Sequence, residues 1–507
     1  MQEDATRCIS CVKYDSSNNQ LVGLVLPLNR EGLPVVQCFP ATTEKEIRKH
    51  FETGTLARYL YFILARPLQD TASCFVLCAF GSDNIFNTQQ VSARWEDMLV
   101  ESAKRDIRIR VFSTDGDPRC LSAMKSFMFS PSQNPLAWHF WFRTDINRNL
   151  VCVQDPTHVA TKLRNLLLRR NILCIGDFFV SVSHIKFMTE RVSKDHHQLT
   201  DGDLNPADRM NYRSAEKLFS ENTTNLLSDF PDTEGTCAFL RMGRNVTEAF
   251  LSRQLQPAER IRMVWTSLFF YRGWRQWIMN HHDYNLSKNF LTTNCYICVE
   301  INAHALILLV RFFRDNKHTL ELGKRRRRLL QLCIFKIIHF IFYLFLFSGE
   351  FAPWLWSSQE CESLFRLLRS LTSTLWTVIN FSVWECLQKL SKVALEESIR
   401  KQLGSTFFFA PTRREGKKRA ETLTDLIFPS DGDILEIIKE AQRDAQCMLV
   451  SLGVHSGVPT VFSSIPEVEP IDSDYESDDE VLHYLRGRPP SPLPVYSLAL
   501  SSFYRLG

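Results

Sequence analysis

Asp115 and Asp117 are separated by a single glycine and follow a predicted buried strand at residues 107–112, which ends in the apolar pair Val111 and Phe112. Carboxylates at a strand end can bind a divalent cation, because Mg²⁺ prefers oxygen ligands. They can also cap the helix that Pro118 would begin, which stabilises a helix by about 1 kcal/mol. These residues taken alone leave both interpretations open.

A third acid, Glu362, lies in a predicted amphipathic helix far along the chain. Cys361, Phe365 and Leu368 recur at helical spacing and predict its buried face, and Glu362 falls on the adjoining stripe with Arg366. Glu362 is therefore able to face a neighbouring sheet. The simpler alternative is an ordinary helix pair between Glu362 and Arg366, worth about 0.2–0.5 kcal/mol.

The first part of the chain alternates between predicted strands and helices. Turn formers at residues 15–19 join two apolar stretches into a hairpin. Asp155 and Pro156 form a good helix start, with the acid at the cap and the proline just inside. Further strands are predicted at 35–39, 74–80 and 150–153, and helices at 89–105, from 118 and from 156. This order indicates a mixed α/β layer with helices packed on a sheet.

From about residue 176 to 320 the pattern becomes helical, with predicted helices at 260–279 and 302–315. Aromatic side chains gather in the first of these helices. We interpret them as core and not as a base-stacking platform, because large aromatic side chains are usually buried. They are Trp265, Phe269, Phe270, Tyr271, Trp274 and Trp277.

Composition narrows the class of protein. The 507 residues are 45% hydrophobic and 23% charged, which suits about two to four globular domains and excludes a fibrous or wholly disordered chain. The 15 cysteines are scattered, so we expect reduced thiols in an intracellular protein. We expect no secretory signal, because Met1 is followed by polar and acidic residues.

Charge is distributed in blocks, although the net charge is only +4. Residues 324–328 and 417–419 are basic and suit phosphate contact or nuclear import, with a solvated face as the simpler alternative. Residues 467–480 are acidic and precede a proline-rich stretch, which predicts a disordered tail.

Residues 329–349 form an apolar run about as long as the ~20 residues of a membrane span. Lys336 and His339 interrupt it, and a central lysine costs about 2.5–3.5 kcal/mol on insertion. We therefore favour a buried insert, and a single membrane span stays as the alternative.

Five stretches of the sequence occur in an order that resembles the catalytic region of cut-and-paste DNA transposases of the P-element and THAP type. They cover roughly residues 3–395 and read EDATRCISCVKYDSSNNQLVGLVLPLNREGLP, STDGDPRCLSAM, VQDPTHVATKLRN, DRMNY and SSQECESLFRLLRSLTSTLWTVINFS. The resemblance implies an α/β, RNase H-like mixed sheet with flanking helices in residues 1–175, and a large α-helical insertion domain in 176–350. Closing helices would follow in 351–400, and 401–507 would form a C-terminal region with the acidic, proline-rich disordered tail.

The resemblance makes Asp4, Asp115 and Glu362 the catalytic acids and the ligands of Mg²⁺ or Mn²⁺, with Glu3 and Asp117 as less favoured neighbours. Two such ions can stabilise the attacking and leaving oxygens of a phosphodiester. The implied activity is DNA strand cleavage and strand transfer in the nucleus. The alternatives are a domesticated remnant that binds DNA or protein without catalysis, and a single-span membrane protein.

The implied partners are DNA at the transposon ends and a homo-oligomer. The resemblance places Asp155 and three basic residues of the same helix near the site or its DNA, and the basic block adds further contacts. The DNA-binding residues are then His158, Lys162, Arg164, Lys324, Arg325 and Arg326.

The sequence departs from the family at its start. Only three residues precede Asp4, whereas a strand usually has about five or six residues. We therefore expect Asp4 to lie at a frayed terminus. We also expect an N-terminally truncated copy that lacks the family's zinc-binding DNA-recognition domain and could be inactive.

Overall fold

The computed structural model describes most of the chain. The residues that it describes are 1–68, 74–128, 150–169, 173–316, 351–357, 359–370, 381–403, 423 and 425–455. Both basic blocks, the apolar run 329–349 and the predicted tail lie outside them.

A five-stranded mixed sheet has β1 (Gln2–Arg7) as its central strand, in the order β5-β4-β1-β6-β7. β1 pairs antiparallel with β4, which pairs antiparallel with β5. On its other side β1 pairs parallel with β6, which pairs parallel with β7. These strands are β4 (Tyr59–Ala65), β5 (Phe75–Ser82), β6 (Val111–Thr114) and β7 (Val151–Gln154). The predicted mixed α/β layer is confirmed.

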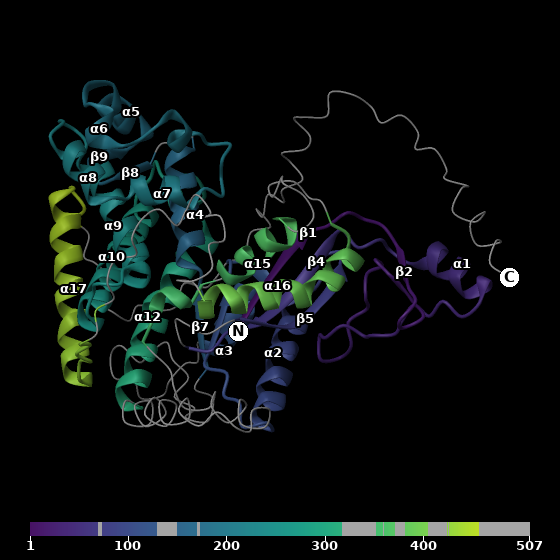
Figure 1. Ribbon diagram of the computed structural model, residues 1–507. Helices are drawn as coiled ribbons and strands as arrows, with labels where there is room; N and C mark the ends of the chain where they lie inside the picture. The colour runs from purple at the N-terminus through teal and green to yellow at the C-terminus, as the bar shows by residue number, and fades with distance from the viewer. Residues whose placement is uncertain are drawn as a thin grey trace. The chain divides into compact units, whose positions relative to one another are not determined.

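Helices cover both faces of the sheet (Figure 1). They are α2 (Thr88–Ala103), α3 (Pro118–Met128), α15 (Gln359–Ser370) and α16 (Val383–Leu403). On one face, Trp95 of α2 stacks on Phe112 of β6 with ring centroids 4.8 Å apart. On the other face, the rings of Phe365 in α15 and Phe62 in β4 lie 5.3 Å apart. The sheet is therefore buried on both sides.

A second core is built from helices and is rich in aromatic side chains. Five of the six aromatic residues predicted as core in α10 are fully buried, and Trp277 is half-buried. The helices are α4 (Pro156–Leu168), α5 (Val182–Arg191), α6 (Lys194–His197), α7 (Tyr212–Leu218), α8 (Glu221–Ser228), α9 (Glu234–Leu251), α10 (Pro257–Met279), α11 (Leu286–Asn289), α12 (Thr293–Asp315) and α17 (Asp431–Ser451). The smaller elements are α1 (Glu44–Thr53), β2 (Lys13–Asp15), β3 (Gln20–Val22), β8 (Leu173–Ile175), β9 (Phe178–Val180) and the 3₁₀ turns η1 (Asp201–Leu204) and η2 (Pro353–Leu355).

One buried side chain joins the two cores. Asn302 of α12 accepts a hydrogen bond from the backbone N–H of Gln154 at 2.8 Å and donates to its backbone oxygen at 2.9 Å. The side-chain amide thus pairs with the end of β7 as a neighbouring strand would. Because β7 is an edge strand, this contact covers backbone groups that would otherwise lack partners.

Helix α17 packs against α10, although it lies within residues 401–507, which the resemblance assigned to a C-terminal region with a disordered tail. Arg262 of α10 forms ion pairs with Asp444 at 2.8 Å and Glu440 at 3.4 Å. Arg314 of α12 binds Asp431 at the start of α17, at 2.8 Å. The chain therefore returns to the helical core after residue 403.

Several predicted elements differ from the structure in detail. The helix predicted at 89–105 is confirmed within about two residues at each end, and the helices predicted from 118 and from 156 begin at Pro118 and Pro156. Residues 35–39 form no strand, β6 begins only at Val111, and the hairpin is limited to β2 and β3. Strand β4 was not predicted, because its run YLYFILA is apolar throughout and shows no period that separates a strand from a buried helix.

Among the described residues, α12 alone is long and apolar enough to cross a membrane, and most of it is buried inside the protein. The core helix of a globular protein passes the same test. The run 329–349, for which a span was considered, lies outside the described residues.

Replacing Asn302 by Leu should destabilise the fold, because the backbone N–H and oxygen of Gln154 would be buried without partners. We expect the free energy of unfolding to fall by about 1–3 kcal/mol. Urea denaturation of the variant beside Asn225→Ala, a change at an exposed helix position, would measure it. Equal stability of the two variants would contradict the prediction.

Candidate active site

The two acids of β1 point to opposite faces of the sheet, because successive side chains of a strand alternate. Glu3 faces α2 and is 2% exposed. Its carboxylate accepts hydrogen bonds from Arg94, Trp95 and Tyr61 at 2.7–3.2 Å. Glu3 therefore belongs to a buried network that joins β1 to α2 and β4. A role as neighbouring metal ligand does not fit this placement.

Asp4 lies on the face of β1 that α15 covers. It is opposite Phe62 of β4, and its carboxylate accepts a hydrogen bond from the N–H of Ala5 at 2.7 Å. The pKa of Asp4 is raised well above its usual value, first by burial and then by repulsion from the carboxylates of Asp115 and Glu362. The three predicted acids are therefore close enough for their charges to interact.

The expectation that Asp4 lies at a frayed terminus is wrong. The ammonium group of Met1 donates to the backbone oxygen of Val111 at 2.7 Å, and the N–H of Ser113 donates to Met1 at 2.9 Å. On the other side, all six residues of β1 pair with β4. Because β1 lies between two strands, the three residues before Asp4 are held by hydrogen bonds to those strands.

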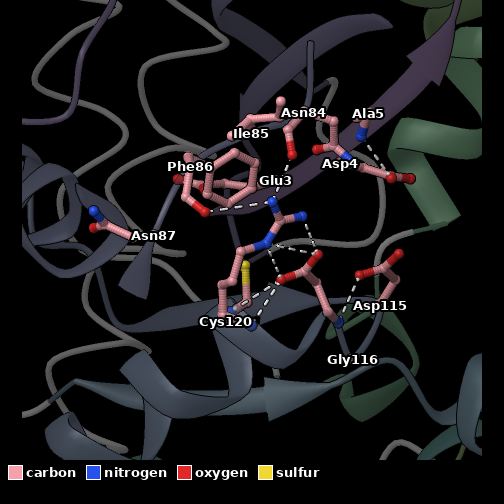
Figure 2. Close-up of polar contacts among 12 residues, drawn as sticks. Glu3, Asp4, Ala5, Asn84, Ile85, Phe86, Asn87, Asp115, Gly116 and Cys120 are labelled. Atoms are coloured by element: carbon pink, nitrogen blue, oxygen red, sulfur yellow. Dashed lines mark hydrogen bonds and ion pairs between the residues drawn. The ribbon is translucent and has the colours of Figure 1, made fainter. Parts of the chain in front are cut away.

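Asp115 and Asp117 have different roles at the end of β6. Asp117 accepts hydrogen bonds from the N–H groups of Arg119 at 2.8 Å and Cys120 at 3.4 Å, and it pairs with the Arg119 guanidinium. These bonds make it the cap of α3. Asp115 accepts a bond from the N–H of Asp117 at 3.2 Å. Figure 2 shows the carboxylates of Asp115 and Asp4 on the same side of the site.

A lysine from α4 lies against the turn that carries Asp115. Lys162 donates from Nζ to the backbone oxygen of Gly116 at 3.3 Å. Gly116 has φ of +91°, a backbone conformation that favours glycine. Burial acts to lower the pKa of Lys162, whereas Cys298 and Asp115 raise it, and the net pKa is above its usual value. The positively charged side chain of Lys162 therefore lies near the carboxylate of Asp115.

Glu362 is brought to the other two acids by the way α15 lies along β1. Cys361 Sγ lies 4.0 Å from Gln2 Oε1, and Arg369 donates to the hydroxyl of Thr6 at 2.7 Å. The helix therefore runs in the same direction as β1, and Glu362 directly follows the residue that contacts Gln2. This agrees with the effect of Glu362 on the pKa of Asp4.

The donor set suits a hard cation, because Asp4, Asp115 and Glu362 offer carboxylate oxygens from three different elements. Their mutual repulsion, seen at Asp4, is the observation that supports such a fit. In the part of the chain that the structure describes, however, no group of three or more His, Cys, Asp or Glu side chains is already assembled closely enough to hold a metal ion.

The predicted DNA-binding residues of α4 divide into three cases. Lys162 lies beside Asp115, as described above. His158 is half-buried, with Nε2 3.9 Å from Asp155 Oδ2. Arg164 is fully buried and donates to the backbone oxygens of residues 203, 205 and 208 at 2.8–3.1 Å. Arg164 therefore holds a loop, and this burial does not fit the predicted contact with DNA. Lys324, Arg325 and Arg326 lie outside the described residues.

Sequence reasoning missed Gln359, the first residue of α15. Its side-chain amide donates to Thr157 Oγ1 at 2.7 Å and to Asp155 Oδ2 at 3.3 Å. Its spacing from Glu362 was the available signal, because residues three apart lie on the same side of a helix. The acceptors could not be foreseen, since they lie about 200 residues earlier in the chain.

Comparison of the chain with protein-family models, curated proteins and solved structures finds no match.

Replacing Asp4 by Asn should stabilise the protein at neutral pH. The pKa of Asp in an unfolded chain is about 3.9, whereas the pKa of Asp4 in the folded protein is higher. As pH rises between these values the unfolded state ionises first, so the free energy of unfolding of the unmodified protein falls. Asn does not ionise, and the variant escapes this loss.

Urea denaturation in EDTA across pH would measure the difference. We expect the stability of Asp4→Asn and of the unmodified protein to converge below about pH 3, where both forms of Asp4 are neutral. The exposed Asp106→Asn serves as the matched control. A stability difference that stays constant with pH would contradict the role of charge.

Proposed function

We propose that this protein is a transposase-like nuclease with an RNase H-like sheet, acting by metal-dependent cleavage and transfer of DNA strands. The observation that supports it is the approach of Asp4, Asp115 and Glu362, whose charges act together on the pKa of Asp4. The resemblance of the sequence also points to these three acids, which come from positions up to 358 residues apart, that is, from 4 to 362.

The strand arrangement supports the proposal independently. In an RNase H-like domain the first acid is carried by the central strand, and Asp4 is on β1, the third of five strands. Asp115 directly follows β6, the parallel neighbour of β1. Acids on adjacent parallel strands meet at one end of a sheet, where a helix can add a third.

Asp4, Asp115 and Glu362 would hold Mg²⁺ or Mn²⁺. Bound there, such ions would activate a water or a 3′-hydroxyl and take up charge on the leaving oxygen. The chain's own residues arrange the ligands: Glu3 keeps Asp4 on the correct face, and Asp117 caps α3 so that Asp115 turns toward Asp4. Lys162 offsets part of the negative charge.

DNA would be held mainly through its phosphates. Such contacts depend strongly on salt and carry little sequence information. We propose DNA as the partner and the nucleus as the location on the strength of this function.

A second candidate is a remnant that keeps the fold and binds DNA or protein without catalysis. One observation favours it: within the described ranges the acids are not assembled as a ready-made metal site. Catalysis would then need the ion, or DNA, to draw the carboxylates together.

Nicking of supercoiled plasmid by the full-length protein tests the proposal. With Mg²⁺ we expect nicked circles, and Asp115→Asn or Glu362→Gln should each lower the rate by about a hundredfold or more, because each removes a group that acts on the transition state. Gel electrophoresis over time measures the rates. Glu436→Gln, an acid-to-amide change in α17, is the control.

The two candidates give different results in this assay. Activity in the unmodified protein that both acid-to-amide changes abolish supports the nuclease. A folded protein that binds the plasmid and never nicks it, with either Mg²⁺ or Mn²⁺, contradicts the nuclease and leaves the non-catalytic remnant.

A further inference from the structure

We propose that Gln359 is a positioning residue, which sets the distance between Glu362 and Asp115 through a clamp formed with Asp155 and Thr157. The inference rests on the proposed function and adds to it the device that assembles the third ligand. The clamp is defined as Gln359, Thr157 and Asp155, and its three side chains are joined by hydrogen bonds.

The clamp begins at the first residue of α15. The amide of Gln359 donates to Thr157 Oγ1 at 2.7 Å and to Asp155 Oδ2 at 3.3 Å. The Thr157 hydroxyl in turn donates to Asp155 Oδ1 at 2.8 Å, and the N–H of Thr157 donates to the same oxygen at 2.8 Å. Asp155 is fully buried, so these bonds are protected from competition with water.

The clamp continues into the strand that carries Asp115. The backbone N–H of Asp155 donates to the backbone oxygen of Thr114 at 2.9 Å, and Thr114 is the residue before Asp115. A path of hydrogen bonds therefore leads from the first turn of α15 to the residue beside the second acid. It crosses between segments that are about 200 residues apart in the chain.

Gln359 and Glu362 are three residues apart, which places them on the same side of the helix one turn apart. Other contacts hold α15 at other points: Glu360 pairs with Arg66 at the end of β4, and Arg369 binds Thr6. Those contacts fix the helix against β4 and β1. The clamp ties its first turn to Asp155, which follows β7 and donates to the end of β6, the strand that Asp115 follows.

The chemistry of the clamp requires a hydrogen-bond donor at position 359. Asp155 and Thr157 Oγ1 present acceptors to it, so a carboxylate there would face Asp155 with like charge. A leucine of similar size would keep the helix but lose both hydrogen bonds. Gln359→Leu is thus the cleanest change.

Mn²⁺ binding by the full-length chain, followed by electron paramagnetic resonance of the free ion, tests the inference. We expect Gln359→Leu to weaken Mn²⁺ binding by about 10–100-fold, the usual effect of losing a group that orients a ligand. Its midpoint of thermal unfolding should stay within about 4 °C of the unmodified protein. Gln446→Leu, the same change at an exposed position of α17, should alter neither value.

A second variant tests the path itself. Thr157→Val keeps the shape of the side chain and removes the hydroxyl between Gln359 and Asp155, so it should weaken Mn²⁺ binding in the same direction. The double variant should be little worse than Gln359→Leu alone, because both changes break one path. Additive losses would overturn the clamp.

The outcomes separate this inference from the proposed function. If the unmodified protein binds Mn²⁺ and Asp115→Asn abolishes binding, the function stands, and unchanged binding in Gln359→Leu overturns the clamp alone. If the unmodified protein binds no Mn²⁺, both fall. Unfolding of both clamp variants would show that these residues serve stability, and would also overturn the inference.

Discussion

The buried carboxylate of Glu3 holds β1 in one register, and the geometry of the candidate site depends on that register. Arg94, Trp95 and Tyr61 all donate to it from the α2 face. Because side chains alternate along a strand, Glu3 on one face requires Asp4 on the other. A slip by one residue would leave Arg94 as a buried charge without its carboxylate, at a cost of about 3–5 kcal/mol. The pair contributes little net stability when compared with well-packed apolar residues, so its main effect is to select the register.

The site also depends on bringing together segments that are far apart in the chain. β1 supplies Asp4, the end of β6 supplies Asp115, and α15 supplies Glu362 after the whole helical region. A side-chain amide lies at each of two contacts between these segments. Asn302 joins α12 to the edge strand β7, and Gln359 joins α15 to the first turn of α4. Each satisfies buried polar groups that apolar packing would leave without partners, which makes the junctions specific in geometry as well as cohesive.

The sequence predicted the features that local physics decides. The cap at Asp155, the start of α3 at Pro118 and the buried line of α15 follow from capping, proline geometry and helical spacing, and the structure has them. Features that depend on distant partners could not be predicted. Asp117 was predicted as a less favoured ligand beside Asp115, and its role as the cap of α3 depends on contacts that include Arg119. Arg164 was predicted to contact DNA, but it binds a loop 39 to 44 residues away. The prediction of a frayed terminus at Asp4 was wrong for the same reason. It was based on the few residues before Asp4, whereas β1 is held by the neighbouring strands β4 and β6.

The candidate site concentrates negative charge, which opposes folding. Burial raises the pKa of Asp4, and repulsion from the carboxylates of Asp115 and Glu362 raises it further. Lys162 offsets only part of this repulsion, from a position against the backbone oxygen of Gly116. A divalent cation, or the polar groups of a bound substrate, would relieve the remaining repulsion. Groups that destabilise a fold in isolation and are relieved by a ligand are characteristic of functional sites, where stability is given up for binding or catalysis. The same reasoning separates Asp4 from Glu3: one residue along the strand, Glu3 is paired with Arg94, whereas the negative charge around Asp4 would be relieved by a ligand of opposite sign.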